Sequence, residues 1–255
     1  MSLLTASARL QWWVLLSDRD YWIDLVRAPL LTIVFLVLIR HSGRPELIAN
    51  GLLAPVLMAV WSMALLVSGE IIDADRQLGT LEPLVAAPAS FPRIVGGRVL
   101  TTTAVSLITA VEVWLIAVLG FGITPQVYHP WVFLAGLLAT AAATACAATL
   151  MASLFVATRT ARTFQNSLSY PFLVLGGVFV PLGLLPAWTH PIGWLVYLSW
   201  SSDLLRDALA PAAVTGVGWR LAVILGLGAG LGLLGRLTLN RVLGRVRSAG
   251  TLGLR

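Results

Sequence analysis

Lysine is absent from this 255-residue sequence, and charged residues of all kinds make up only 11% of it. A soluble globular domain usually carries about a quarter charged residues, so the composition excludes an ordinary soluble fold. The absence of lysine also excludes a phosphate loop of the Gly-x-x-x-x-Gly-Lys-[Ser/Thr] type, because its lysine reaches the terminal phosphates. If ATP powers this protein, another polypeptide must bind the nucleotide.

Cysteine and histidine are also scarce. Cys146 is the only cysteine, so no disulfide can form within the chain, and it lies inside an apolar run. The three histidines stand singly, without the helical spacing of metal ligands, at positions 41, 129 and 190. No serine, histidine and acidic residue form a recognisable catalytic pattern. We therefore expect no catalytic residue, no metal site and no cofactor bound by this chain.

Apolar side chains fill most of the sequence and account for 58% of its residues. Several apolar runs approach the ~20 residues with which a helix crosses the ~30 Å hydrocarbon core of a bilayer. This pattern predicts one all-α membrane domain over residues 1–255, with six transmembrane helices. Their expected bounds are 22–39, 51–68, 99–119, 131–157, 164–180 and 219–234.

The ends of the chain and the arginines predict the topology. Tryptophans and an arc of charged residues favour an amphipathic interfacial helix in residues 1–27. If the N-terminus is cytoplasmic, thirteen of the 17 arginines lie inside, and those outside are Arg40, Arg44, Arg206 and Arg220. This bias predicts a multi-pass protein of a bacterial-type plasma membrane with both termini in the cytoplasm. The basic charge therefore reflects topology, and we expect the lipid bilayer, not nucleic acid, as its partner.

The most charged stretch, residues 69–98, lies between the second and third predicted spans. It holds four acidic residues and three arginines, and its prolines divide it into short pieces. The run Gly79-Thr80-Leu81-Glu82 is typical of a helix start, where a hydroxyl and an acid suit the unpaired N–H groups and the helix dipole. A short charged helix between two apolar spans does not serve to cross the bilayer. We expect it to contact a partner in water.

The same stretch resembles the first cytoplasmic loop of the permease subunits of type-2 ABC exporters. In that family the loop forms a coupling helix that docks on a separate ATPase subunit, which binds ATP and magnesium. The resemblance rests on Asp75-Arg76, Gly79-Thr80-Leu81-Glu82, Leu84, Pro88 and Gly97-Arg98. It implies that the ATPase contact is made by Asp75, Arg76, Gly79, Thr80, Leu81, Glu82 and Leu84. Asp75 and Glu82 are then the candidates for charged docking contacts.

A second resemblance lies between the fifth and sixth spans, in residues 181–218. This segment is too apolar for a plain loop, yet its prolines and charges fit a seventh span poorly, which favours short re-entrant helices. It resembles the family's Gly-x-Phe-x-Pro, Leu-Pro and Leu-Arg pattern, which forms two external helices over the cavity. Pro181, Pro186 and Arg206 carry the pattern here. Ser199-Trp200 stands where the family usually has a proline shortly before Leu-Arg.

Two places within the spans are candidates for a translocation pathway. Glu112 is the one acid inside an apolar run, where an ionisable group costs on the order of a few kcal/mol unless it is paired or hydrated. It could line the pathway or bind a cationic substrate; alternatively it pairs with a neighbouring hydroxyl or amide, or reaches the outer interface. Asn166, Ser169 and Tyr170 begin the fifth span, where they either face the cavity or form contacts between helices.

The resemblance implies the permease subunit of an ATP-driven exporter that works by alternating access. Two copies, or one copy and a related chain, would pair beneath two ATPase subunits. A hydrophobic or amphipathic small molecule, or a lipid-like substrate, is the favoured cargo. Two alternatives stay open, which are a proton-coupled secondary transporter and a membrane scaffold that transports nothing.

Overall fold

The computed structural model describes residues 3–17, 19–44, 47–77, 79, 91–157 and 161–249, and these contain helices but no strand. Helices satisfy their own backbone hydrogen bonds, as a hydrocarbon environment demands. The all-α prediction is therefore confirmed. In chain order the elements are α1 (Leu3–Ser17), α2 (Arg19–Ser42), α3 (Ile48–Gln77), α5 (Phe91–Ser106), α6 (Ile108–Phe121), α7 (Pro130–Ala157), α8 (Ala161–Leu175), η2 (Leu182–Leu184), η3 (Ala187–Thr189), α9 (His190–Trp194), α10 (Tyr197–Leu209) and α11 (Val217–Ala249).

Within the described residues, four helical stretches are long and apolar enough to cross a membrane. They are Ile48–Leu65, Ile94–Phe121, Pro130–Leu154 and Val217–Arg241. These stretches coincide with the second, third, fourth and sixth predicted spans. The first predicted span lies within α2, and the fifth overlaps α8, which has only 15 residues. Six crossings thus stay a prediction, whereas a multi-pass membrane protein is supported.

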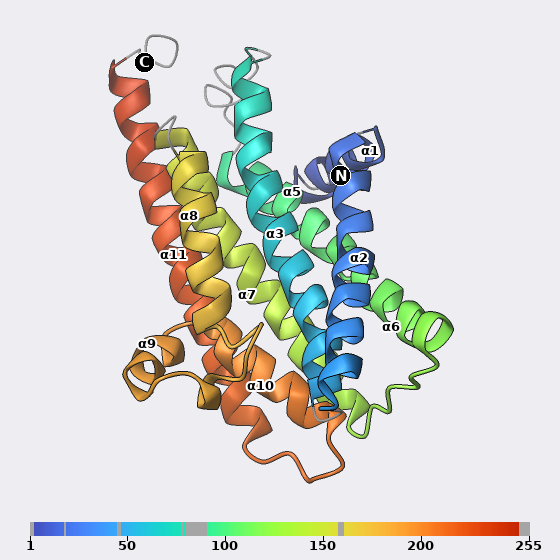
Figure 1. Cartoon of the computed structure of the whole chain (residues 1–255). Coiled ribbons are helices and arrows are strands. Elements are labelled where there is room, and N and C mark those ends of the chain that lie inside the picture. Colours follow the sequence, from blue (N-terminus) through green and yellow to red (C-terminus); the bar gives the residue numbers. More distant parts are fainter. Residues whose placement is uncertain are drawn as a thin grey trace.

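Figure 1 shows that α1, the last turns of α3 and the end of α11 lie at one end of the bundle, which we call the terminal end. Helices α9 and α10 lie at the opposite end, which we call the cap end (Figure 1). The described ends of the chain thus lie at the same end of the bundle, and the short helices between α8 and α11 lie at the other. The side of the membrane that each end faces stays a prediction.

Helix α3 is the centre of the fold. In its apolar stretch 67% of the residues are buried within the chain, against 11% in the corresponding stretch of α11. Its buried side chains form one cluster with residues of α2, α6, α7, α8, α10 and α11. The Trp61 ring stacks on Phe172 of α8, with ring centroids 4.5 Å apart. The position of α3 therefore sets where its neighbours can pack.

The N-terminal region forms two helices and not the single interfacial helix expected in residues 1–27. Helix α1 ends at Ser17, and α2 begins at Arg19. The buried side of α1 carries Ser7, Gln11 and Leu15, one helical turn apart. The Nε of buried Arg98 donates a hydrogen bond to Gln11 Oε1 over 2.9 Å, which ties α1 to α5. The interfacial segment is therefore held to the bundle by a buried polar contact.

The third predicted span, 99–119, is not one continuous helix, because α5 ends at Ser106 and α6 begins at Ile108. Hydroxyl groups surround this break. Ser106 Oγ donates to the Thr103 carbonyl over 2.7 Å, and Thr109 Oγ1 donates to the Ser106 carbonyl over 2.6 Å. Such back-bonding competes with the helix ladder and bends helices. The run of hydroxyl residues from 101 to 109 is the sequence signal for the bend.

The fifth predicted span, 164–180, is also wrong in its bounds. Helix α8 covers Ala161–Leu175, with Pro171 inside it, and Gly176 and Gly177 follow its end. Gly177 has φ +63, a left-handed conformation that glycine adopts without strain and that commonly follows the end of a helix. The chain then turns into the short helices of the cap.

Helices α7 and α11 pack closely through small residues. A methyl group added at Gly228, Gly232 or Gly235 would approach α7 atoms at 2.6, 3.1 and 2.6 Å, respectively. Gly226 and Gly230, the other pair of the same spacing, have no atom within 4 Å of such a group. Only one of the two small-residue stripes of α11 therefore forms the helix contact that such stripes favour.

We expect Gly228→Ala to destabilise the purified protein by about 1–3 kcal/mol, because the added methyl overlaps the Ala143 backbone. Gly230→Ala is the matched control, since its methyl meets open space. The control should change stability by no more than about 1 kcal/mol, and in the stabilising direction that helix propensity gives. Thermal unfolding of both variants in detergent measures the difference. Equal midpoints would contradict the α7–α11 packing described above.

Candidate functional site

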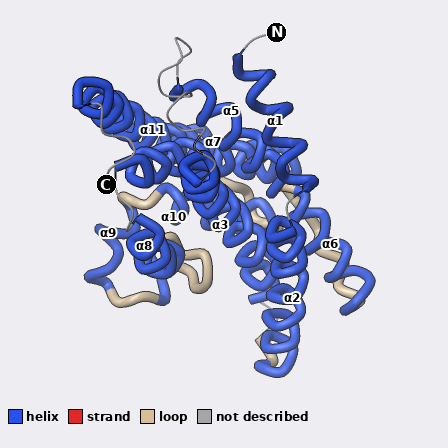
Figure 2. The backbone as a smooth tube through the Cα atoms, turned by 90° about the horizontal axis from the view of Figure 1, so that it is seen from above, coloured by secondary structure: helices blue, strands red, loops and turns tan. Residues whose placement is uncertain are grey.

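A pocket of about 640 Å³ lies between α2, α3 and α8. Figure 2 shows α2 and α8 on either side of α3, so α3 forms the back of this pocket. Its lining combines apolar side chains with a few polar groups, as ligand pockets commonly do. The lining residues are Arg27, Ala28, Leu31, Pro55, Met58, Ala59, Ser62, Met63, Leu65, Ser169, Tyr170, Leu173 and Phe179.

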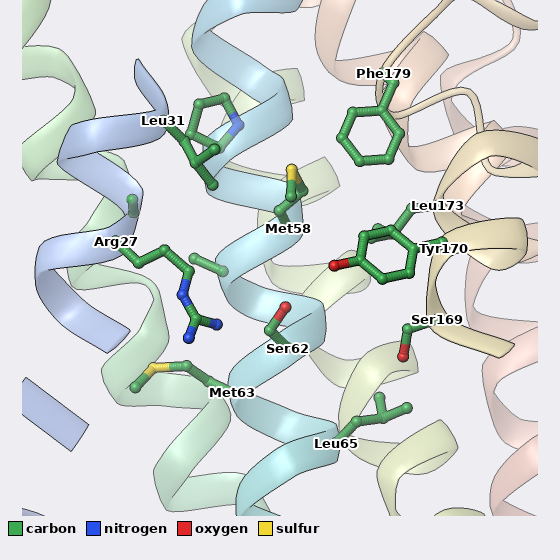
Figure 3. A pocket seen from close by; sticks show the side chains of 13 residues that line it. Arg27, Leu31, Met58, Ser62, Met63, Leu65, Ser169, Tyr170, Leu173 and Phe179 are labelled. Carbon is green, nitrogen blue, oxygen red and sulfur yellow. The ribbon is translucent and has the colours of Figure 1, made fainter. Parts of the chain in front are cut away.

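The polar groups of the pocket lie at its middle, with apolar side chains on both sides of them (Figure 3). The Arg27 side chain extends from α2 across the pocket toward Ser62 of α3, and Ser169 of α8 lies on the opposite wall (Figure 3). Leu31 and Phe179 lie on the other side of the Tyr170 ring, nearer the cap end (Figure 3). Among the described residues that line the pocket, Arg27 is the only charged one. Polar groups beside apolar walls suit an amphipathic ligand.

Aromatic rings hold the walls of the pocket in place. Phe172 lies next to Leu173 in α8 and stacks on Trp61, its interplanar angle being 13°. Tyr197 of α10 is fully buried, lies 6.2 Å from the Phe172 ring and donates its hydroxyl hydrogen to Thr144 Oγ1 over 2.9 Å. The wall formed by α8 is thus anchored to α3, α7 and α10 together.

The cap is bound to the end of α8 by hydrogen bonds to backbone carbonyls. Ser202 Oγ of α10 donates to the Gly176 carbonyl over 2.9 Å. Arg206 donates to the Gly177 carbonyl and forms an ion pair with Asp203. These contacts satisfy carbonyls that the α8 helix leaves unpaired where it ends. A displacement of α8 must therefore displace α10 as well.

The predicted cap residues lie in this assembly. Pro181 and Pro186 immediately precede the 3₁₀ turns η2 and η3, where a proline's fixed φ suits the first position. Ser199 and Trp200, which replace the usual proline, both bind the α9 region. Ser199 Oγ donates to the Gly193 carbonyl over 2.7 Å, and Trp200 Nε1 donates to the Trp194 carbonyl over 3.0 Å. Side-chain hydrogen bonds thus fix the turn between α9 and α10.

Burial shifts the pKa values of Asp203 and Arg206, which form the ion pair in the cap. Desolvation raises the pKa of Asp203, while the charge of Arg206 and its hydrogen bond act in the opposite direction. Desolvation likewise lowers the pKa of Arg206, and Asp203 opposes that shift. Each partner thus keeps the other ionised in a setting that disfavours charge.

The predicted coupling residues are described only in part. Helix α3 continues past residue 68 to Gln77, because no glycine or proline follows Gly69 until Gly79. Asp75 and Arg76 therefore belong to its last turn, and not to a loop. Gly79 is exposed and has φ +66, the conformation of a glycine that follows a helix end. Thr80, Leu81, Glu82 and Leu84 lie outside the described residues.

The predicted pathway residues separate into two places. Ser169 and Tyr170 line the pocket, and Asn166 lies on α8 with its side chain outside the described residues. Glu112 lies on α6 and does not line this pocket. Its carboxylate Oε2 is buried and has no hydrogen-bond partner in the part of the chain that the structure describes. Glu112 therefore lies apart from Tyr170.

Arg27 and Ser62 line the pocket although neither was predicted to do so. Arg27 fell on the charged arc of the expected interfacial helix, and only the break after Ser17 places it on a bundle helix. Ser62 is a single hydroxyl inside an apolar run, which indicates a polar contact in the membrane but not which helix it faces.

Comparison with protein families supports the resemblance in the sequence. The family described as ABC-2 type transporter matches residues 3–210, which include α1, the pocket and most of the cap. A comparison with curated proteins gives no match.

Removing the Arg206 guanidinium should destabilise the cap more than removing the less buried Arg220. We expect Arg206→Gln to cost about 1–3 kcal/mol, because it leaves the Gly177 carbonyl without its donor and removes the partner of a partly exposed Asp203. Arg220→Gln breaks the more exposed pair with Asp207 and should cost at most about 1 kcal/mol. Thermal unfolding in detergent compares the two variants.

The pH dependence of the same variants gives a second readout. Arg206 lowers the pKa of Asp203, so its removal leaves that pKa further raised. A carboxyl whose pKa is raised by folding binds its proton more tightly in the folded state, so stability falls as the pH rises through that range. Arg206→Gln should therefore lose more stability than Arg220→Gln as the pH rises above about 4, the ordinary range of an aspartate carboxyl. Parallel pH profiles would show that Asp203 does not depend on Arg206.

Proposed function

Because the chain belongs to the ABC-2 type transporter family, whose match covers residues 3–210, we propose that it is the permease of an ATP-driven exporter. Membership in the family makes it a membrane-spanning transport subunit of an ABC transporter and not a catalytic one. Outward transport, the class of substrate and the manner of coupling to an ATPase are the parts that we propose. The family also argues against a proton-coupled transporter and a non-transporting scaffold.

The proposed substrate is a hydrophobic or amphipathic molecule that binds between α2, α3 and α8. The polarity of the pocket is the observation that carries this proposal, with Arg27 and Ser62 at its middle and apolar side chains beyond Tyr170. An amphipathic ligand could place its polar group beside these residues and its apolar part toward Phe179. Glu112 lies outside the pocket, so we assign it no role in binding the substrate.

Coupling to the ATPase would pass through α3. This helix has 30 residues, so it is about 45 Å long and reaches from the back of the pocket to Gln77. On the far side of the coupling segment, α5 is held to α1 by the Arg98–Gln11 hydrogen bond. A partner that moves residues 79–84 would therefore pull on two anchored helices. This geometry supports a lever in which ATPase closure opens and closes the pocket.

We also propose that a second copy, or a related chain, completes the pathway. Tyr170 lines the pocket and is nevertheless 68% exposed in the single chain. Val174, one turn later on α8, is 40% exposed. A partner permease that covers this side of α8 would enclose the pocket.

A bulky side chain at the centre of the pocket should block transport. The Ser62→Phe ring should fill the space between α2 and α8 where the substrate binds. We expect it to weaken substrate binding by about 1.4 kcal/mol or more, which lowers the apparent affinity about tenfold. Leu225→Phe is the control, because it adds a ring at an exposed position of α11, outside the pocket lining and away from α8. Efflux of a fluorescent amphipathic dye from cells that also make the ATPase partner measures both variants. Unchanged efflux by Ser62→Phe would place the pathway elsewhere.

A charge reversal at Glu82 should uncouple the ATPase. We expect Glu82→Arg to insert and fold, to lose copurification with the ATPase subunit and to lose export, because a docking carboxylate becomes a cation. Glu46→Arg, in the connection between α2 and α3, is the matched control and should retain both activities. Copurification from membranes, followed by ATP hydrolysis of the complex, gives the measurement. Full ATP-dependent export by Glu82→Arg would refute the docking role.

A further inference from the structure

A second apolar groove lies on the other side of α2, between α2 and α6, and the pocket described above does not include it. Two adjoining cavities form the groove, with volumes of about 370 and 500 Å³, and both are lined by Phe121. The first is also lined by Leu36, Ile39, Arg40, Gly43, Arg44, Ile48 and Ile123. The second is also lined by Ile33, Leu115, Ile116, Leu119 and Gly120.

Two arginines form the mouth of this groove at the cap end of α2. Arg40 belongs to the last turn of α2, and Arg44 follows Gly43, whose φ of +66 turns the chain away from the helix. Both side chains are exposed. Within the part of the chain that the structure describes, neither guanidinium has an ion pair or a side-chain hydrogen bond. Two cations that line one cavity attract an anion.

The rest of the groove is apolar and lies on a surface suited to hydrocarbon. Leu119 of α6 is 80% exposed, and Leu38 of α2, which precedes Arg40 by two residues, is 60% exposed. Such exposed apolar side chains on long apolar helices are expected to face lipid chains and not water. The groove therefore joins two cations at the membrane boundary to a hydrocarbon-lined channel. This arrangement matches a phospholipid, whose phosphate is joined to long acyl chains.

We propose that the α2–α6 groove binds one anionic phospholipid from the leaflet at the cap end. Its phosphate binds Arg40 and Arg44, and one acyl chain lies along Ile33, Leu115 and Leu119. Basic clusters beside membrane helices bind anionic headgroups, each arginine contributing about a fivefold gain in affinity. A zwitterionic lipid has the same chains but adds a positive charge that the arginines repel, so the groove should prefer the anionic lipid.

The site does not depend on the proposed transport function. Residues of α2 that line the groove, from Ile33 to Arg40, differ from Arg27, Ala28 and Leu31, which line the pocket. The lipid would therefore remain bound whether or not the pocket carries cargo.

The test uses the full chain in nanodiscs with a trace of phosphatidylglycerol that carries a photoreactive group at the end of one acyl chain. Crosslinked peptides are identified by mass spectrometry. We expect labels on residues 33–44 and 115–123, and competition by unlabelled phosphatidylglycerol but not by phosphatidylcholine. The double variant R40Q/R44Q should reduce labelling by about 25-fold, which is a fivefold loss for each arginine.

A second variant tests the groove without removing charge. Gly120→Leu places its Cβ 3.9 Å from Ile116 Cγ2, an ordinary contact, and extends its side chain into the groove. It should reduce the labelling of residues 115–123 while the arginines remain. R236Q/R241Q removes two exposed arginines near the terminal end and serves as the matched control, with labelling of the groove unchanged.

Two results would overturn the proposal. If neither R40Q/R44Q nor Gly120→Leu lowers the labelling relative to the control, no lipid is held in the groove. If a Leu119→Cys variant instead forms a disulfide-linked dimer and the lipid label is absent, a second copy of the chain occupies the groove. Thermal unfolding of each variant in lipid-free detergent identifies any that fail to fold. If R40Q/R44Q fails to fold, R40K/R44K replaces it in the test, and it should retain the label because it keeps both charges.

Discussion

The need to satisfy every backbone polar group away from water constrains this structure wherever a helix is interrupted. At the break between α5 and α6, the hydroxyls of Ser106 and Thr109 bind nearby carbonyls. At the end of α8, the Gly176 and Gly177 carbonyls receive donors from Ser202 and Arg206 of α10. Each interruption thus depends on side chains placed beside it, and the second one binds the cap to the pocket wall.

The pocket follows from this arrangement and from the burial of α3. Trp61 joins α3 to Phe172 of α8, and Tyr197 joins the same cluster to Thr144 of α7. Because Phe172 is held by these rings, Tyr170 on the opposite side of α8 faces the open side of the pocket, and Ser169 lies on the pocket wall across from Arg27. The same packing that stabilises the core therefore orients the polar groups of the pocket.

The sequence predicted the class of fold, because apolar runs near the length of a bilayer admit few structures other than helices. It predicted Ser169 and Tyr170 as pathway candidates and the short helices of the cap. It did not predict the break at Leu107, because apolar length hides a local competition for carbonyls by the hydroxyls of Ser106 and Thr109. Arg27 was missed because its segment was assigned to an interfacial helix, whereas it belongs to α2. Glu112 stood out in the sequence, yet its neighbours were set by the packing of α6, which composition does not determine.

The length of α8 has a consequence for how the pocket could open. Its 15 residues span about 22 Å, less than the ~30 Å of a hydrocarbon core, so the cap elements must make up the remaining depth. Arg206 and Ser202 bind the end of α8 directly, and α10 also packs on α7 through Tyr197. A tilt of α8 that widened the pocket would therefore either carry α10 with it or break the Arg206 contact at Gly177. In the first case the cap moves as a lid joined to the pocket wall, and in the second the largely buried Arg206 guanidinium loses its hydrogen bond to Gly177. The cost of leaving the Gly177 carbonyl and the guanidinium without that bond favours the first, so the cap and α8 are best understood as one moving unit.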